Sequence, residues 1–140
     1  MIFLISGSLI VILLNIALHS YAIKYLKNNY QNIQSSNSYA IITIILLSSH
    51  VAQVFLFALL YFYLIKFFPH LGSFSGSEDS IFIDVFYYSF NCYTTLGMGD
   101  VYATGLIRMP AVIESLIGLI MIAWSASLLL SILINKKEIN

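Results

Sequence analysis

The chain has few charged side chains, a single cysteine and a single arginine, and each shortage excludes a class of protein. Only 9% of its 140 residues are Asp, Glu, Lys or Arg, against about a quarter in soluble globular domains. The lone Cys92 excludes an intrachain disulfide and any paired-cysteine metal site, so we expect it only to pack. Because Arg108 is the sole arginine, the chain lacks the arginine series of a voltage sensor.

Apolar sequence makes up most of the chain instead. Hydrophobic residues account for 60% of the composition, and the mean hydropathy is +0.92. Roughly 20 apolar residues cross the hydrocarbon core of a bilayer, and three runs approach or exceed that length: 1–23, 40–66 and 109–134. We therefore predict an all-α membrane protein with three transmembrane helices and no room for a separate soluble domain.

The polar segments between these runs predict the domain organisation. Residues 24–39 are rich in Lys, Asn, Gln and Ser and read as a loop, with Asn37 or Ser38 as the N-cap of the next helix. The first run lacks a basic start and a small-residue cleavage pattern, so we expect a retained helix rather than a signal peptide. The chain thus divides into an N-terminal helix with its cytoplasmic loop, 1–39, and a second region, 40–135.

Residues 81–94 predict a helix that enters the membrane without crossing it. Thirteen mostly apolar residues, 81–93, follow Ser77 and Ser80, either of which is a suitable N-cap. At 1.5 Å per residue this helix is too short to span, and it is too apolar for water. Irregular backbone at membrane depth is tolerated only where it is buried in protein or lines a watery cavity. A re-entrant helix followed by a pore-lining loop satisfies that condition.

The loop after this helix, residues 95–99, has the composition of an ion filter. Gly97 and Gly99 can adopt positive φ, which turns successive carbonyls toward one side of the chain. The hydroxyl of Thr95 closes the row at one end. Such oxygens replace the water shell of a dehydrated cation when several loops form a ring. The sequence therefore predicts a cation-conducting pore.

The segment from Thr95 to Asp100 resembles the T-V-G-Y-G-D signature of potassium-channel pore domains, with Leu96 for Val and Met98 for Tyr. The resemblance implies a homotetramer, and it implies potassium bound at Thr95, Leu96, Gly97 and Met98. It also implies four elements within the pore domain at 40–135: an outer helix 40–66, a pore helix 81–94, a filter 95–99 and an inner helix 109–134.

The resemblance implies further roles around the filter. Tyr87 and Tyr88 correspond to paired aromatics that support the filter from behind, Thr94 caps the pore helix, and Asp100 lies at the pore mouth. Gly118 occupies the place of an inner-helix hinge, although a small residue there also serves close helix packing. Three inner-helix residues are expected to face the cavity: Ala126, Ser127 and Leu130.

Glu114 lies within the last apolar run, where a carboxyl group is costly unless it is paired. It does not share a helix face with Arg108, six residues earlier. We therefore expect a hydrogen bond to the pore helix or to the filter backbone. Asn91, one turn before the filter, is a candidate partner.

The distribution of lysines predicts the orientation. Lys24, Lys27, Lys136 and Lys137 share one side, which the positive-inside rule makes cytoplasmic, with the N-terminus outside the cell membrane. The opposite side gathers acidic residues that would attract cations to the mouth. These are Glu78, Asp79, Asp84 and Asp100, although Glu78 and Asp79 are equally explained as solvated loop residues.

Two other functions fit parts of the sequence. Met98 is flexible and apolar where the family has tyrosine, which favours a nonselective cation channel as the alternative. His19 and His50 each lie within a predicted span, and two such histidines are typical of a haem-binding redox protein. No nucleophile, base and acid share a helix face, so we expect no enzyme. We also expect no cofactor beyond potassium. The expected partners are lipid and further copies of the chain, and we expect neither nucleic acid nor a soluble partner.

Overall fold

The computed structural model describes residues 2–30, 36–76 and 80–139. Within these ranges the fold is almost entirely helical, as predicted, and three segments are long and apolar enough to cross a membrane: Phe3–Asn29, Ser38–Phe67 and Gly105–Ile134. Ser77, Glu78 and Asp79 lie outside the described residues. The elements in order are α1 (Ile2–Tyr30), α2 (Ser36–Phe67), η1 (Pro69–Leu71), β1 (Phe74–Ser75), α3 (Ile81–Tyr93), β2 (Tyr102–Ala103), η2 (Gly105–Ile107) and α4 (Arg108–Ile139).

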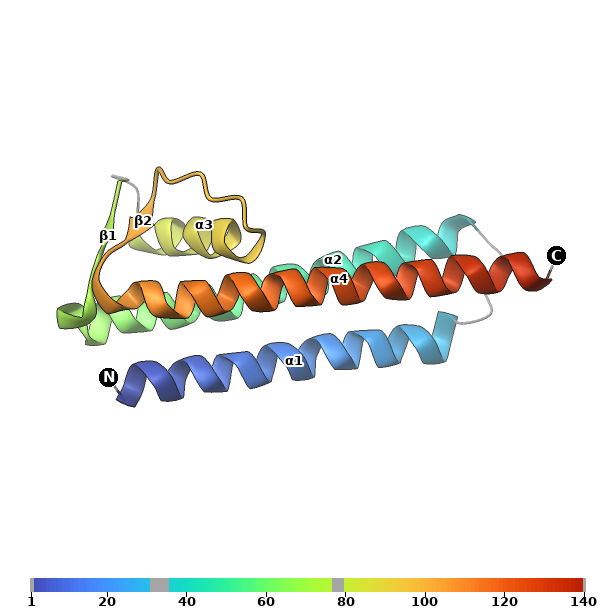
Figure 1. Cartoon of the computed structure of the whole chain (residues 1–140), viewed down its shortest axis with the longest axis horizontal. Helices are drawn as coiled ribbons and strands as arrows, with labels where there is room; N and C mark the ends of the chain where they lie inside the picture. Colours follow the sequence, from blue (N-terminus) through green and yellow to red (C-terminus); the bar gives the residue numbers. More distant parts are fainter. Residues whose placement is uncertain (1, 31–35, 77–79, 140) are drawn as a thin grey trace.

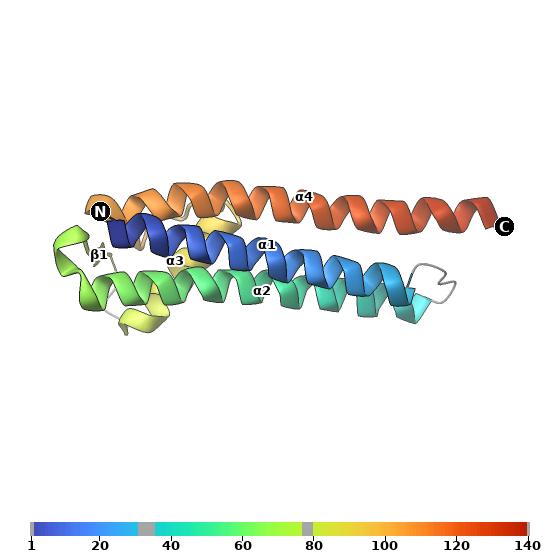
Figure 2. The ribbon, with the colours of Figure 1, turned by 90° about the horizontal axis from the view of Figure 1, so that it is seen from below.

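The three long helices run side by side, and the short α3 lies beside one end of them (Figure 1). The loop after α3 doubles back toward the end of the bundle from which α3 started, which is the end that holds the N-terminus (Figure 1). The C-terminus lies at the opposite end. Seen from the other direction, α1 lies in front of the pair formed by α2 and α4, on the side away from the loop (Figure 2). The short helix is thus re-entrant.

The first two helices are longer than the sequence analysis predicted. The prediction of a loop at 24–39 is wrong for most of that segment, because α1 continues to Tyr30 and α2 begins at Ser36. The reason is a buried stripe: Ile23 and Leu26 point into a cluster with residues of α2 and α4, while Lys24 remains exposed. Lysine is a good helix former and does not interrupt such a stripe.

The main core surrounds α2 near the end of the bundle that holds the N-terminus. Phe57, Tyr61 and Leu64 are completely buried there, and their spacing by three or four residues places them on one helix face. They pack against α3 and α4 as one hydrophobic cluster, whose other members include Val85, Tyr93, Ile107 and Ala111. This packing fixes the position of α3 against α2 and α4.

A small clamp joins the loop before α3 to the segment that follows the doubled-back loop. In it Phe74 pairs with Ala103 and Ser75 with Tyr102 as an antiparallel ladder, and the Thr104 amide donates to the Ser73 carbonyl at 2.8 Å. The clamp closes at Gly105, which has a φ of 64°. A side chain there would have its Cβ 2.4 Å from the Leu71 carbonyl oxygen.

We predict that Gly105→Ala loosens this clamp. The new Cβ combines a disfavoured backbone conformation with a clash against backbone atoms, so the free energy of unfolding should fall by about 1–3 kcal/mol. Gly7→Ala is the matched control, because the nearest atom to its Cβ is the flexible end of Leu60, at 3.1 Å. Thermal unfolding in detergent measures both, and equal losses would contradict the clamp.

Candidate functional site

Both ends of α3 are defined by local hydrogen bonds. The Ser80 hydroxyl accepts from the Ile83 amide at 3.4 Å, which makes Ser80 the N-cap. Thr94 is the C-cap, and its hydroxyl donates to the Phe90 carbonyl at 2.7 Å. The Leu96 amide then bonds to the Asn91 carbonyl at 2.9 Å. The chain therefore leaves α3 in a tight turn into residues 95–99, the segment that the sequence analysis predicted as the filter and that we call the filter loop.

The backbone of the filter loop alternates between ordinary and left-handed conformations. Thr95, Gly97 and Gly99 have φ values of 57°, 63° and 79°, so both glycines behave as the sequence predicts. Among the described residues, Thr95 is the only non-glycine with positive φ. For a β-branched residue this conformation is strained by about 1–3 kcal/mol. Strain at the first residue of the loop is characteristic of a functional site.

The filter loop lies on the surface of the single chain. Every residue from Thr94 to Asp100 is exposed, and Leu96 and Met98 expose 61% and 62% of their surface. The loop faces away from α1, which lies on the opposite side of the molecule (Figure 1). No other part of the described chain covers the loop.

A pocket of about 400 Å³ lies between α3, α4 and the filter loop. Asn91, Cys92, Met98 and Ser115 are among the side chains that line it. The side-chain oxygen of Asn91 has no hydrogen-bond partner there. The pocket shows that the side chains of this chain leave room behind the filter loop.

The two adjacent tyrosines of α3 have separate roles. The Tyr87 hydroxyl donates to the Asp100 carboxylate at 2.8 Å, and this hydrogen bond is the main reason that the pKa of Asp100 lies below its usual value. Tyr88 instead packs edge-on against Tyr61 and Phe74, with ring centroids 5.4 and 4.7 Å away. Tyr87 thus reaches the end of the filter loop, and Tyr88 joins α3 to the core and the clamp.

Glu114 is completely buried and joins three helices. One carboxyl oxygen accepts from the Tyr61 hydroxyl of α2 at 2.6 Å, and the other is hydrogen-bonded to the Ser89 hydroxyl of α3. The expected bond to the pore helix is therefore present. Asn91 as its partner is wrong, because its amide group turns back to the Tyr87 carbonyl.

The bonds of Ser89 indicate the protonation state of Glu114. Ser89 also donates to the Val54 carbonyl at 2.8 Å, and a serine hydroxyl has one hydrogen. Both short contacts are satisfied together if Glu114 is protonated and donates to the Ser89 oxygen. The site then holds a neutral acid and no buried charge. The sequence indicated that Glu114 needed donors, but not that hydroxyls on two other helices would supply them.

Gly118 lies where α4 crosses the end of α3. A Cβ at this position would be 2.1 Å from the Tyr93 carbonyl oxygen, so only glycine allows this approach. The sequence left two interpretations of Gly118, a hinge and a site of close helix packing. The contact with Tyr93 favours close packing, and the hinge stays a prediction. Further along α4, Ala126, Ser127 and Leu130 are all exposed in the single chain.

The geometry of the two membrane histidines does not fit a haem. The rings of His19 and His50 lie 5.2 Å apart between centroids, which leaves no room for a macrocycle between them. Both nitrogens of His50 have partners, at 2.8 Å from the Tyr93 hydroxyl and 3.0 Å from the Ser125 hydroxyl. The nitrogens of His19 are likewise within reach of side chains of α2 and α4. We therefore reject the haem hypothesis.

We predict that Glu114→Gln is tolerated and Glu114→Ala is not. Glutamine keeps an acceptor for Tyr61 and a donor for Ser89, so the free energy of unfolding should change by less than about 1 kcal/mol. Alanine leaves a cavity and a buried hydroxyl without its acceptor, which should cost about 2–4 kcal/mol. Thermal unfolding of the purified variants measures the difference. Equal destabilisation by both substitutions would show that the site requires a charge.

The comparison with known protein families agrees with this geometry. The model of the ion channel family Ion_trans_2 matches residues 49–135, more than half of the chain. The matched segment runs from the middle of α2 through α3 and the filter loop to α4. Searches of curated proteins and of solved structures each gave no match. The chain belongs to the Ion_trans_2 family of ion channels, whose pore domain is of the two-helix, potassium-channel-like type.

Proposed function

We propose that the chain is one subunit of a homotetrameric channel that conducts potassium ions through residues 95–99. The observation that carries the proposal is the alternation of positive φ at Thr95, Gly97 and Gly99. Alternating conformations turn consecutive carbonyls to the same side, and stacked carbonyls are the oxygens that replace the hydration shell of potassium. The channel acts by passive conduction, without catalysis.

In the assembly the carbonyl oxygens of Thr95, Leu96, Gly97 and Met98 bind the ions, and Gly99 completes the filter. The exposed surface of the filter loop supports this arrangement, since one chain leaves its other sides open. Four chains related by a closed rotation would surround an axis. The C-terminal end of α3 also points toward the start of the loop, where its partial negative charge favours a cation.

The positive-inside rule, together with this arrangement, supports a placement in the membrane. The chain is a multi-pass membrane protein, and we place it in the cell membrane with the filter mouth and N-terminus outside. The N-terminus and the mouth lie at one end of the bundle and the C-terminus at the other (Figure 1). α1 lies on the face away from the filter loop, so it would contact lipid at the rim of the tetramer.

The charge at the mouth comes from Asp100. This carboxylate is exposed and bonded to Tyr87, and four copies would raise the local concentration of cations. Asp84, in contrast, is buried in the first turn of α3. There it favours the start of the helix rather than the mouth.

Met98 and the pocket behind the filter loop favour a second candidate, a cation channel that does not distinguish potassium from sodium. Met98 lines that pocket, and it is flexible and has no hydrogen-bond donor. Ion flux into liposomes that contain the purified protein, under potassium and sodium gradients, separates the two. Potassium-dependent flux alone supports potassium selectivity, and equal fluxes select the nonselective channel. No flux from a verified tetramer contradicts conduction altogether.

We predict that Met98→Tyr raises the ratio of potassium to sodium permeability. Tyrosine fills more of the pocket of about 400 Å³ and supplies a hydroxyl within a region that contains the unpartnered oxygen of Asn91. A firmer filter loop discriminates better between ions of different size. Reversal potentials under mixed ionic conditions measure the ratio. Met98→Leu, which adds no hydroxyl, is the control, and an unchanged ratio in the tyrosine variant would contradict the prediction.

The pair formed by Tyr87 and Asp100 predicts a pH dependence at the mouth. The hydroxyl of Tyr87 keeps the pKa of Asp100 below its usual value, so the carboxylate is charged at neutral pH and loses its charge only when pH falls through that lowered pKa. Tyr87→Phe removes the bond, so the loss should occur at a higher pH. Asp100→Asn should reduce conductance roughly twofold or more at low ionic strength and little at high salt.

Conductance titrations between pH 6 and pH 3, a range that includes the usual aspartate pKa of about 3.9, measure this difference. The native protein should keep its conductance to lower pH than Tyr87→Phe. Superimposable titrations would contradict a role for the pair. Asp100→Asn should remove the acid limb of the titration in both backgrounds.

A further inference from the structure

One buried polar atom in the pocket behind the filter loop has no partner in the described chain. Asn91 lines this pocket and is only 8% exposed. Its side-chain amide group donates to the Tyr87 carbonyl at 3.0 Å, and because a carbonyl only accepts, the nitrogen must face Tyr87. The side-chain oxygen, Oδ1, is therefore the unpartnered atom. A buried acceptor without a donor is costly, so the pocket favours an occupant that donates a hydrogen bond.

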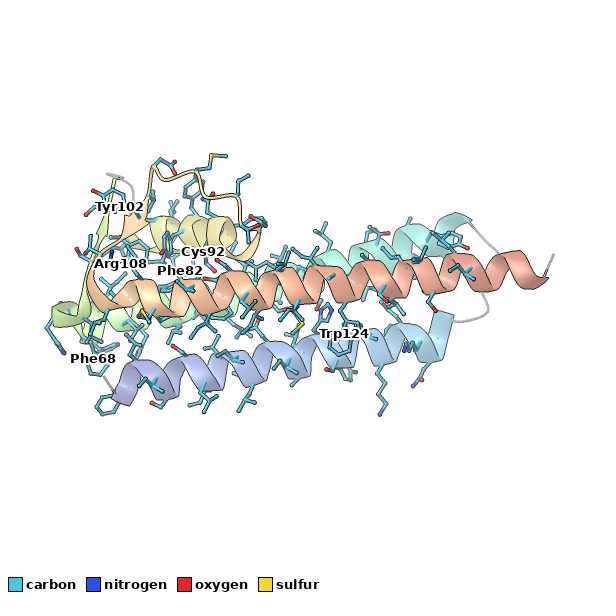
Figure 3. All side chains as sticks on the ribbon, viewed as in Figure 1. Phe68, Phe82, Cys92, Tyr102, Arg108 and Trp124 are labelled. Atoms are coloured by element: carbon cyan, nitrogen blue, oxygen red, sulfur yellow. The ribbon has the colours of Figure 1, made fainter. Side chains whose placement is uncertain are left out.

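The pocket has the size and composition of a ligand site. Its volume is about 400 Å³, whereas one water molecule accounts for about 30 Å³ of the liquid. Ligand pockets measure about 300–1,000 Å³ and are mostly apolar, with a few polar groups that orient the ligand. Met98 and Val101 line this one, as do Cys92 of α3 and Tyr102 of β2, which Figure 3 shows on the same side of α4 as the filter loop. The space exceeds what one water molecule fills.

The lining also defines the charge of the occupant and the direction of its hydrogen bond. Among the described residues, those that line the pocket are all of uncharged types, so a buried ion would have no partner there. Ser115 of α4 lines the pocket as well, and its hydroxyl already donates to the Ala111 carbonyl at 3.0 Å. Asn91 Oδ1 and the Ser115 oxygen can thus only accept. A neutral molecule with a hydroxyl or amide hydrogen satisfies both conditions.

Two tyrosine rings favour an aromatic body for this molecule. Tyr88 of α3 and Tyr102 of β2 both line the pocket, and aromatic pairs gain from offset-stacked or edge-on contacts beyond the area that they bury. The thioether of Met98 also makes favourable contacts with aromatic rings. A phenol combines such a ring with the hydroxyl that Asn91 requires. The methyl ether of the same phenol has the ring but no hydrogen to donate.

The filter loop forms one wall of the pocket. Thr95, Gly97 and Gly99 line it, and these are the three residues of the loop whose φ is positive. Met98 lies between the two glycines and lines the pocket with them. An occupant that packs against these residues therefore restrains the same backbone that binds the ions in the proposed function.

We propose that this pocket is a binding site for a small neutral molecule of the phenol class. Its hydroxyl donates to Asn91 Oδ1, and its ring packs between Met98 and the rings of Tyr88 and Tyr102. Occupation restrains the filter loop and so raises the ratio of potassium to sodium permeability. The effect on permeability rests on the proposed function, whereas the binding does not.

Binding is tested by NMR of the purified full chain in lipid nanodiscs, with ¹³C-labelled methionine methyl groups and para-cresol as the probe. The Met98 signal should shift in a saturable way. Met109 and Met121 are controls in the same sample, because Met109 is exposed on the groove between α1 and α4 and Met121 is buried. An unchanged Met98 signal would show that water or a neighbouring chain fills the pocket, and equal shifts of Met98 and Met109 would show unspecific partition. Either result would overturn the site.

The hydrogen bond to Asn91 is tested with para-cresol and its methyl ether on two proteins. Relative to the ether, the native chain should bind para-cresol roughly three- to tenfold more tightly than Asn91→Leu does, the factor that corresponds to one net hydrogen bond. Comparison of both compounds on both proteins cancels their different partition into lipid. The same ratio of affinities in both proteins would overturn the assigned bond.

A second variant keeps the test decisive if Asn91→Leu does not fold. Ser115→Leu fills the pocket from α4, so it should abolish the shift of Met98 with both compounds. Ser131→Leu is the matched control, since Ser131 is exposed on α4 and lies outside the pocket lining, and it should bind as the native chain does. Native binding in a folded Ser115→Leu protein would overturn the location of the site.

The effect on the filter is tested by reversal potentials with and without saturating para-cresol. In the native protein the ratio of potassium to sodium permeability should rise roughly twofold or more. In Met98→Tyr the ratio should not respond, because the new side chain already places a phenol in the pocket. Binding without a change in the native ratio, or an equal rise in Met98→Tyr, would overturn the link to the filter. Binding to a verified tetramer that passes no ions would contradict the proposed function and not the site.

Discussion

The structure depends on the requirement that polar groups at membrane depth find their partners within the protein. α3 is too short to cross the bilayer and ends in an irregular loop, so it cannot be stable there by itself. Two polar connections hold it: Ser89 with Glu114 and Tyr61 in the middle of the helix, and Tyr93 with His50 and Gln53 of α2 at its end. Apolar packing against α2 fills the space between them.

These connections explain how a strained filter loop can persist. The left-handed conformation of Thr95 costs free energy, and it is held because the turn before it is fixed by hydrogen bonds and by the contact of Gly118 with Tyr93. At the other end, Tyr87 holds Asp100 and the clamp holds the returning chain. The loop between these supports is exposed, which suits a surface that further chains complete.

Local composition was sufficient to predict the spans, the re-entrant helix and the positive φ of Gly97 and Gly99, because each depends on nearby residues alone. The continuation of α1 past Lys24 was not predictable in this way, since it depends on Leu26 packing against helices that are distant in sequence. The same holds for Glu114, whose donors Tyr61 and Ser89 are 53 and 25 residues away. His19 and His50 were noticed as polar, but their hydrogen-bond partners Gln53, Tyr93 and Ser125 come from three other places in the sequence.

The central claim is that four filter loops surround one axis and bind dehydrated potassium through their carbonyl oxygens. The most direct measurement is a crystal structure of the purified assembly with thallium in place of potassium, read from anomalous differences. The account predicts a tetramer with peaks on the axis between the carbonyls of Thr95, Leu96, Gly97 and Met98. A tetramer whose axis shows no ion at this level, or an assembly that places the loops apart from one another, would contradict it.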